Sequence, residues 1–160
     1  MKETMDQFLQ RVSKIEFTYI IREMCETFFT LEFKEEGIKS KVNIMGIVEA
    51  NEELDFSKEL ENKIIEYLIK TNMKNWKEEY LLDDSEEIVD KKFEWNLIVT
   101  FKDNSTKKSH GINNSPRKMI HMTKISMAIQ MLAMEKSKKT HYRENPDGSL
   151  TFIGWWFYYQ

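Results

Sequence analysis

Three polar side chains near the middle of the chain have the types and spacing to bind an anion. His110 precedes a glycine, and Arg117 lies one helical turn before His121, just after the Ser-Pro pair at 115–116 where a helix is predicted to begin. The free amides and the dipole of a helix N-terminus favour negative charge. His110, Arg117 and His121 are therefore a candidate cluster for a phosphate or carboxylate. The simpler alternatives are an ordinary capped helix and a buried histidine that bonds to a neighbour.

The other reactive residues give weak signals for catalysis or metal binding. Cys25 is the single cysteine, and the carboxylates on either side of it oppose thiolate formation. The acidic run at 83–87 lacks the spacing and the glycine of an EF-hand loop, so a solvated loop is expected there. The sequence contains no zinc-binding spacing, phosphate-binding glycine loop or G-x-S-x-G elbow. We therefore expect no cofactor and no metal, and a role that is not enzymatic.

The C-terminal segment is a candidate surface for binding another protein. Residues 150–159 alternate in a way that makes both faces of a strand apolar, as in a covered central strand or an adhesive one. Trp and Tyr are frequent anchors of protein interfaces. The residues predicted to bind a partner here are Trp155, Trp156, Tyr158 and Tyr159.

A predicted helix from Pro116 to about Lys136 offers a second candidate surface, because it has two apolar stripes on roughly opposite sides. The first stripe should pack on the sheet and comprises His121, Ile125, Ala128, Ile129 and Leu132. The second comprises Ile120, Met127, Met131 and Met134, and Met127 and Met131 are its predicted partner-binding residues. The alternative is that the last strand or the N-terminal helix covers this stripe. We expect that alternative for the methionines, with part of the aromatic terminus left exposed for a partner.

The stretch that precedes this helix predicts a β-hairpin. Apolar residues alternate from Phe93 to Phe101, and successive side chains of a strand point to opposite faces. Asp103-Asn104 favours a tight turn because both residues tolerate left-handed backbone angles. The polar segment 106–110 is typical of a return strand at a lysine-bearing sheet edge. Ser115 is the expected N-cap of the helix that follows.

This stretch resembles a group of small, uncharacterised bacterial proteins. The resemblance rests on Trp95-x-Leu97, a short hairpin, and Gly111-x-Asn113-x-x-Pro116 ahead of a helix, and it covers about 40 residues. The chain departs from that pattern in lacking an Asp-Gly turn and an aromatic residue just before the proline. The resemblance implies a bacterial α+β protein and assigns no activity and no catalytic residue.

The remaining segments predict an α+β fold. Residues 3–12 have the spacing of a short amphipathic helix, and strands are expected at 15–21, 27–33 and 38–48 as an antiparallel meander. Asp55 or Ser57 begins a helix that pauses near Asn72 and resumes through 76–81. The prediction is a single domain, 1–160, with an antiparallel sheet of about six strands. Its helices pack on one face, in the order α-β-β-β-α-β-β-α-β.

Composition narrows the class of protein and its location. Hydrophobic residues make up 41% of the chain and aromatic residues 12%, which favours a folded core over disorder. One cysteine excludes an internal disulfide and fits a reducing compartment. No apolar run reaches the roughly 18 residues that span a bilayer, and the N-terminus lacks a signal-peptide core. We therefore expect a cytoplasmic protein without membrane contact.

The charge is divided along the chain although the net charge is only −3. Residues 1–101 hold 14 basic and 23 acidic groups, whereas residues 102–143 hold 10 basic and 2 acidic groups. The leading hypothesis is a non-enzymatic protein-binding module of the inhibitor, immunity or adaptor type, a monomer or a homodimer. One alternative is a nucleic-acid-binding protein that uses segment 102–143, although only Tyr142 is there to stack on bases. The other is an unrecognised small enzyme.

Overall fold

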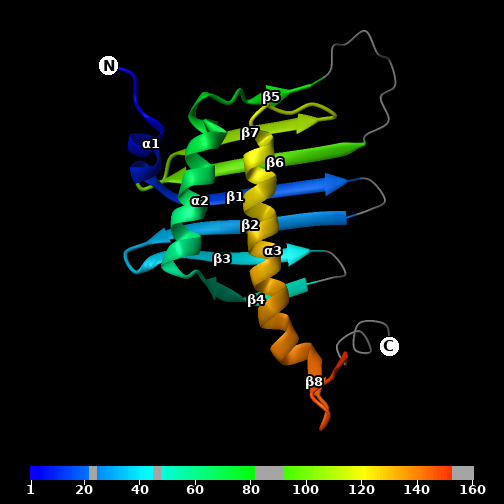
Figure 1. Ribbon diagram of the computed structural model, residues 1–160. Coiled ribbons are helices and arrows are strands. Elements are labelled where there is room, and N and C mark those ends of the chain that lie inside the picture. The colour runs from blue at the N-terminus through cyan, green and yellow to red at the C-terminus, as the bar shows by residue number, and fades with distance from the viewer. Residues whose placement is uncertain (22–24, 45–47, 82–91, 153–160) are drawn as a thin grey trace.

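The computed structural model describes residues 1–21, 25–44, 48–81 and 92–152. These form a seven-stranded sheet with helices against it, and a small two-stranded sheet that follows the last helix (Figure 1). The helices are α1 (Met5–Arg11), α2 (Lys58–Thr71), the short 3-10 helix η1 (Met73–Asn75) and α3 (Met119–His141). The strands are β1 (Val12–Ile21), β2 (Cys25–Lys34), β3 (Gly37–Ile44), β4 (Val48–Asp55), β5 (Glu79–Tyr80), β6 (Phe93–Phe101), β7 (Thr106–Ile112), β8 (Tyr142–Glu144) and β9 (Leu150–Phe152).

The large sheet has the strand order β4-β3-β2-β1-β6-β7-β5. Its pairs are antiparallel except for β5, which pairs with β7 in parallel through two residues. The predicted meander of three strands is confirmed and is extended by β4. The α+β class is also confirmed, but the sheet is mixed and has more strands than predicted. The return strand β7 is not the sheet edge, because β5 lies outside it.

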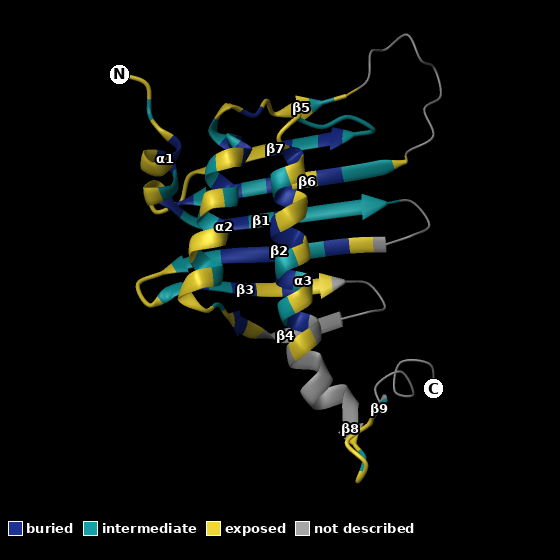
Figure 2. Cartoon of the chain, in the orientation of Figure 1, coloured by how far each residue is buried: buried dark blue, intermediate teal, exposed yellow. Residues whose placement is uncertain are grey.

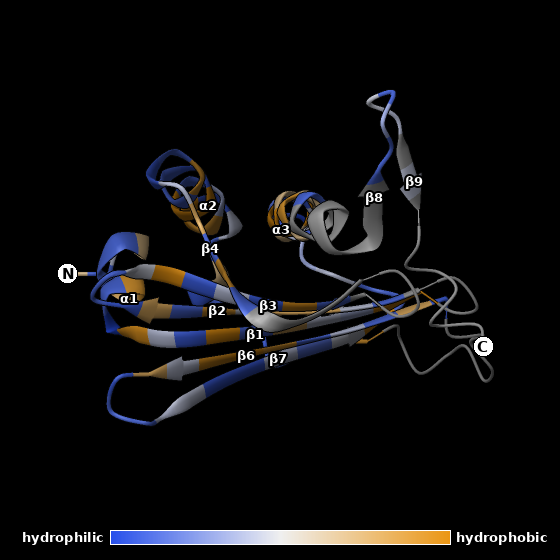
Figure 3. Cartoon of the chain, turned by 90° about the horizontal axis from the view of Figure 1, so that it is seen from below, coloured by the Kyte–Doolittle hydropathy of each residue, from blue (hydrophilic) through white to orange (hydrophobic). Residues whose placement is uncertain are grey.

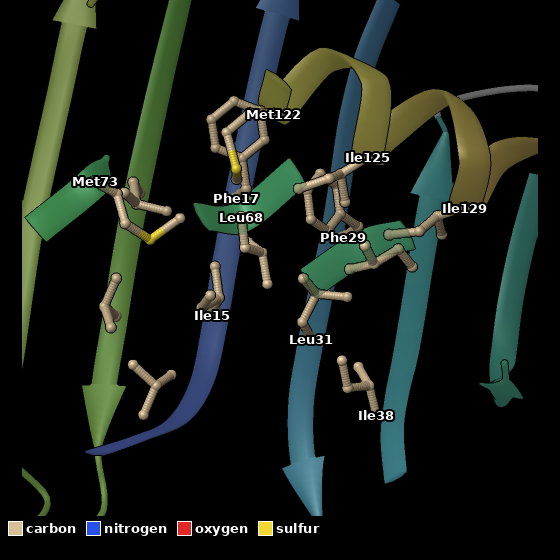
Figure 4. Packing of buried hydrophobic residues seen from close by; sticks show 14 of the residues in the cluster. Ile15, Phe17, Phe29, Leu31, Ile38, Leu68, Met73, Met122, Ile125 and Ile129 are labelled. Carbon is tan, nitrogen blue, oxygen red and sulfur yellow. The ribbon is translucent and has the colours of Figure 1, made fainter. Parts of the chain in front are cut away.

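One face of this sheet carries the core. Alternate residues of the central strands point to this face, and α2 and α3 cover it (Figures 3 and 4). Fully buried side chains come from both layers, so the helices and the sheet exclude water from each other. The largest of them are Trp95, Phe29, Ile15, Leu31, Leu54, Ile64, Leu68, Met73, Leu97, Met122, Ile125 and Ile129.

The short helix α1 closes one end of this core. Thr4 and Gln7 form a reciprocal capping box, which satisfies amides at the helix start that have no partner within the helix. Phe8 is buried and meets the ring of Phe101 edge to face, with 5.4 Å between the ring centres. The predicted helix at residues 3–12 is thereby confirmed, and the buried Val12 already belongs to β1.

The opposite face of the sheet is polar, and no described helix lies against it (Figure 3). Lys14 and Glu16 form an ion pair at 3.2 Å on this face, and Lys39 pairs with Asp55 across β3 and β4. Such partly exposed pairs contribute little to stability because water screens them. The helices therefore pack on one face only, as predicted.

Several predicted boundaries are wrong. The third strand ends at Ile44 rather than Val48, and Val48 begins a separate strand, β4. The helix α2 begins after its N-cap Ser57 and is capped by the left-handed Asn72. Segment 76–81 contains the two-residue strand β5 and no resumed helix. The long helix begins at Met119 rather than Pro116, because residues 116–119 first make a turn in which the Pro116 carbonyl accepts from the Met119 amide.

The end of the described chain lies apart from the large sheet. The helix α3 runs past β4 and carries the hairpin of β8 and β9 (Figure 1). The turn predicted at Asn145–Gly148 is confirmed, with a positive φ of 83° at Gly148. In the described residues the last strand thus pairs with β8 and not with the large sheet. No helix among the described residues is long and apolar enough to cross a membrane.

Candidate protein-binding surface

The inner side of α3 is fixed by packing on the sheet. Met122, Ile125 and Ile129 recur at three- and four-residue intervals and are fully buried against strand residues such as Phe17 and Phe29 (Figure 4). This spacing sets the rotation of the helix about its axis. Residues on the opposite side must therefore face away from the sheet. Of the first predicted stripe, Ile125 and Ile129 are buried, and His121, Ala128 and Leu132 are half-buried.

The outer side of α3 exposes the second apolar stripe. Ile120 is 58% exposed, Met127 57% and Met131 66%. Met127 and Met131 follow Ile120 by 7 and 11 positions, about 20° to either side of it at 100° per residue, so the three form one line. We call Ile120, Met127 and Met131 the α3 stripe. Met127 and Met131 are exposed, so the expectation that the methionines belong to the core is wrong for these two. The side chain of Met134 and residues 153–160 of the segment expected to cover the stripe lie outside what the structure describes.

Basic residues flank the α3 stripe. Arg117 and Lys118 precede the helix and are exposed, and Lys124 is exposed between Ile120 and Met127. Exposed positions recur along the described part of α3 (Figure 2). The Lys124 ammonium lies 5.9 Å from the centre of the Tyr67 ring of α2, a cation–π contact that directs it toward α2. The stripe is therefore an apolar line with positive charge at its N-terminal end.

The structure does not bring the three predicted anion-binding residues together. Ser109 and Gly111 are buried on the helix-covered side of β7, so His110 between them points to the open face. There its Nε2 lies 3.8 Å from the Glu79 carboxylate. His121 belongs to α3 on the other side of the sheet, so His110 and His121 cannot bind one ligand.

His121 lies on the side of α3 that faces α2. Its Nδ1 is buried and has no hydrogen-bond partner among the described residues. Burial lowers the pKa of His121, and the positive charges of Lys124, Lys70 and Lys118 lower it further. His121 therefore stays neutral at neutral pH, and the expected hydrogen bond to a neighbour is absent at Nδ1 in the described part of the chain.

Trp95, Gly111 and Asn113 form a joint, by which we mean a set of contacts that fixes the loop before α3 to the strand β6. The Trp95 indole Nε1 donates a hydrogen bond of 2.8 Å to the Asn114 carbonyl and lies directly over Gly111. A Cβ at position 111 would come within 2.8 Å of the Trp95 Cε2 atom and still closer to Nε1 and to the Asn114 carbonyl. Glycine at 111 is thus required by the close approach of the indole.

Asn113 completes this joint. Its backbone is left-handed, with φ of 53°, and its amide donates to the Phe93 carbonyl at 3.0 Å. Its side-chain Oδ1 accepts hydrogen bonds from the Lys92 and Phe93 amides at 2.7 and 3.1 Å. The residues that carry the resemblance thus fasten the loop before α3 to the start of β6. Their role here is to place α3.

The remaining predicted chemistry is not assembled in the described structure. Among the described residues, no three His, Cys, Asp or Glu side chains are grouped to hold a metal ion. The backbone of Cys25 begins β2 and pairs with Ile21. The acidic run 83–87 and the aromatic residues Trp155, Trp156, Tyr158 and Tyr159 lie outside the described residues, so their predicted roles stay predictions.

The basic side chains that the structure describes in segment 102–143 do not share one face. Lys107 points into the helix side of the sheet, where its Nζ donates to the Trp76 carbonyl at 2.8 Å and burial lowers its pKa. The next residue, Lys108, points to the open face and is exposed. Lys124 lies on the helix layer. A nucleic-acid patch in this segment would use six basic residues, which are thus divided between two sides of the sheet: Lys102, Lys107, Lys108, Arg117, Lys118 and Lys124.

Comparisons of the chain with protein-family models, with characterised proteins and with solved structures returned no match. The function therefore has to be argued from the geometry of this chain.

Proposed function

We propose that this chain is a non-enzymatic protein-binding module of the inhibitor, immunity or adaptor type, and that it binds through the α3 stripe. The observation that carries the proposal is the exposure of Ile120, Met127 and Met131 in one line on a helix that is anchored to the core. We also assign the chain to the small bacterial proteins that share its Trp95-x-Leu97 and Gly111-x-Asn113 motifs, and place it in the cytoplasm.

Physical chemistry favours contact with another protein at this line. Large side chains that stay exposed on one line of a helix keep apolar surface in water, which is unfavourable unless a partner covers it. Methionine is flexible and polarisable, so it adapts to the shape of a partner. The line is about 16 Å long at 1.5 Å per residue, which is the length of three helical turns. A partner helix fits a surface of this shape.

The distribution of polar groups supports binding over catalysis. His110 and His121 lie on opposite sides of the sheet, and the pKa of His121 is lowered by burial inside the helix layer. An acid, a base and a nucleophile within hydrogen-bond reach of one another are needed for most hydrolytic chemistry. The α3 stripe offers apolar contacts and flanking cations in place of such a group.

Recovery of the protein from its native cell, with its bound partners, tests the proposal. Met127→Gln with Met131→Gln keeps the helix but makes the stripe polar. Lys41→Gln with Lys108→Gln changes two exposed positions on the open face of the sheet and serves as a matched control. We expect a discrete partner to be recovered with the wild type and the control, and its Kd to weaken by about tenfold or more with the stripe variant.

Circular dichroism and the melting temperature of all three proteins establish that the folds are equal. A partner that binds the stripe variant as tightly as the wild type would refute the proposed surface. Turnover of a substrate by the purified chain would refute the non-enzymatic class.

A further inference from the structure

The residues along the α3 stripe are spaced so that two copies of the stripe can pack against each other. Ile120 and Met131 lie at its two ends, with Lys124 and Met127 between them at equal distances from the midpoint. We propose that two copies of this chain pair through α3, with the helices antiparallel about a two-fold axis that crosses the stripe midway between Ile120 and Met131. This inference rests on the proposed function, because it names the partner of the same stripe.

In a dimer with this two-fold axis, each apolar side chain of the α3 stripe is covered by the second copy. Ile120 of one copy lies against Met131 of the second copy, and the reverse contact follows by symmetry. Met127 of one copy lies against the methylene stem of Lys124 of the second copy. The cation–π contact with Tyr67 draws the Lys124 ammonium toward α2, so that its stem is free to cover a methionine.

The exposed charges at the two ends of the stripe are complementary in this arrangement. Arg117 lies in the turn just before α3, three residues before Ile120, and Glu135 lies four residues after Met131; both are exposed. Antiparallel helices bring the N-terminal end of one stripe against the C-terminal end of the other, so Arg117 of one copy lies near Glu135 of the second copy. The pair occurs twice in the dimer. A parallel arrangement would instead bring the N-terminal ends of the two stripes, each with an Arg117, to the same end of the dimer.

The same axis also brings α2 against α2. The contact of Lys124 with Tyr67 shows that the midpoint of the stripe lies beside the middle of α2. The outward residues Glu59 and Lys70, near the two ends of α2, then lie opposite each other between copies. A stable interface buries about 800 Å² on each partner, more than three side chains supply, and α2 adds the required area.

Charge reversal tests the pairing. Arg117→Glu or Glu135→Arg alone should weaken self-association, measured by sedimentation equilibrium, by about tenfold, because each places like charges together. The combination of both changes in one chain should restore the wild-type Kd. Lys108→Glu is the matched control, since Lys108 is an exposed lysine on the open face of the sheet, away from α3. Failure of the combined variant to recover association would overturn the proposed geometry.

Engineered disulfides test the direction of the helices. In a Cys25→Ser background, Ile120→Cys chains are mixed with Met131→Cys chains and oxidised. We expect crosslinks between the two kinds of chain and few between identical chains. Predominant crosslinking of Ile120→Cys chains with each other would mean parallel helices and would overturn the inference.

Different results would refute the proposed dimer and the proposed function. A wild type that stays monomeric at about 100 µM overturns the dimer. If such a monomer still binds a different protein, and Met127→Glu with Met131→Glu abolishes that binding, the proposed function stands without the dimer. If the wild type is a dimer that the same double variant converts to a folded monomer, both stand.

Discussion

Gly111 lies directly beneath the Trp95 indole, so the space for a side chain at this position is already filled. Asn113 stands two residues later in a left-handed conformation and accepts two backbone amides. In the sequence, these residues stood out through a resemblance to other proteins, and in the structure they contact one another. The physical meaning of this motif, a joint that places α3, depends on contacts between β6 and the loop after β7 that spacing does not specify.

Gly111→Ala should therefore destabilise the fold by about 3 kcal/mol, at the upper end of the cost of overpacking, because backbone and indole must both shift. Gly148→Ala is the matched control: its φ is also positive, but nothing lies within 4 Å of the added carbon. The control should lose only about 1 kcal/mol. Urea unfolding measures both. Equal losses in the two variants would contradict the close approach at Gly111.

His121 should make stability depend on pH. Its pKa in the fold is lowered by burial and by Lys124, Lys70 and Lys118, so the unfolded chain takes up the proton first as pH falls through about 6.5. The free energy of unfolding should then fall between about pH 7.5 and 5.5, a range above the usual carboxylate pKa values. His121→Gln should lose less stability over that range. Parallel pH profiles for the variant and the wild type would exclude this role of His121.

The elements differ in how far the sequence specifies them. Alternation and periodicity were sufficient for β6, for the first strands of the meander and for α1, because each has one clearly apolar side. The strand β4 was missed because its charged residues outnumber its apolar ones, and it forms by pairing with β3. The two-residue β5 has no pattern of its own and exists through contact with β7.

The helix α3 shows why the binding surface could not be assigned from its sequence. Both of its sides are apolar, so periodicity alone left open which side packs on the sheet and whether the other is covered. The rotation is decided by Met122, Ile125 and Ile129, which meet the sheet. Met122 was absent from both predicted stripes. The start of the helix was placed early because Ser115-Pro116 resembles a cap, whereas here it begins a turn.

Trp95 is the side chain that ties β6 to the neighbouring elements. It is fully buried, meets the ring of Trp76 edge to face at 5.6 Å and the ring of Tyr80 at 5.7 Å, and donates to the Asn114 carbonyl. Trp95→Ala should lower the free energy of unfolding by about 3–5 kcal/mol. Trp95→Phe should cost less, because it keeps most of the ring volume. A wild-type-like chemical denaturation curve for Trp95→Ala would contradict the central position of β6.

At the scale of the whole molecule, the two sides of the sheet differ in chemistry. The open face holds paired and solvated charges, whereas the helix layer carries the α3 stripe and the exposed cations Arg117, Lys118 and Lys124. The division of charge along the chain predicted one basic region, but adjacent residues of a strand point to opposite faces. Lys107 and Lys108 were separated in this way. Residues seven positions apart in a helix lie on the same side, so the residues of the α3 stripe form one surface.

The most direct measurement is site-specific photo-crosslinking in extracts of the native cell. A photo-crosslinking residue in place of Met127 should form a discrete protein adduct, either with a second copy or with another protein. The same residue in place of Lys108, exposed on the open face of the sheet, should form little adduct. The account predicts a high yield at position 127 and a low one at position 108. Absence of an adduct at 127, or equal yields at the two positions, would contradict the assignment of the α3 stripe as the binding surface.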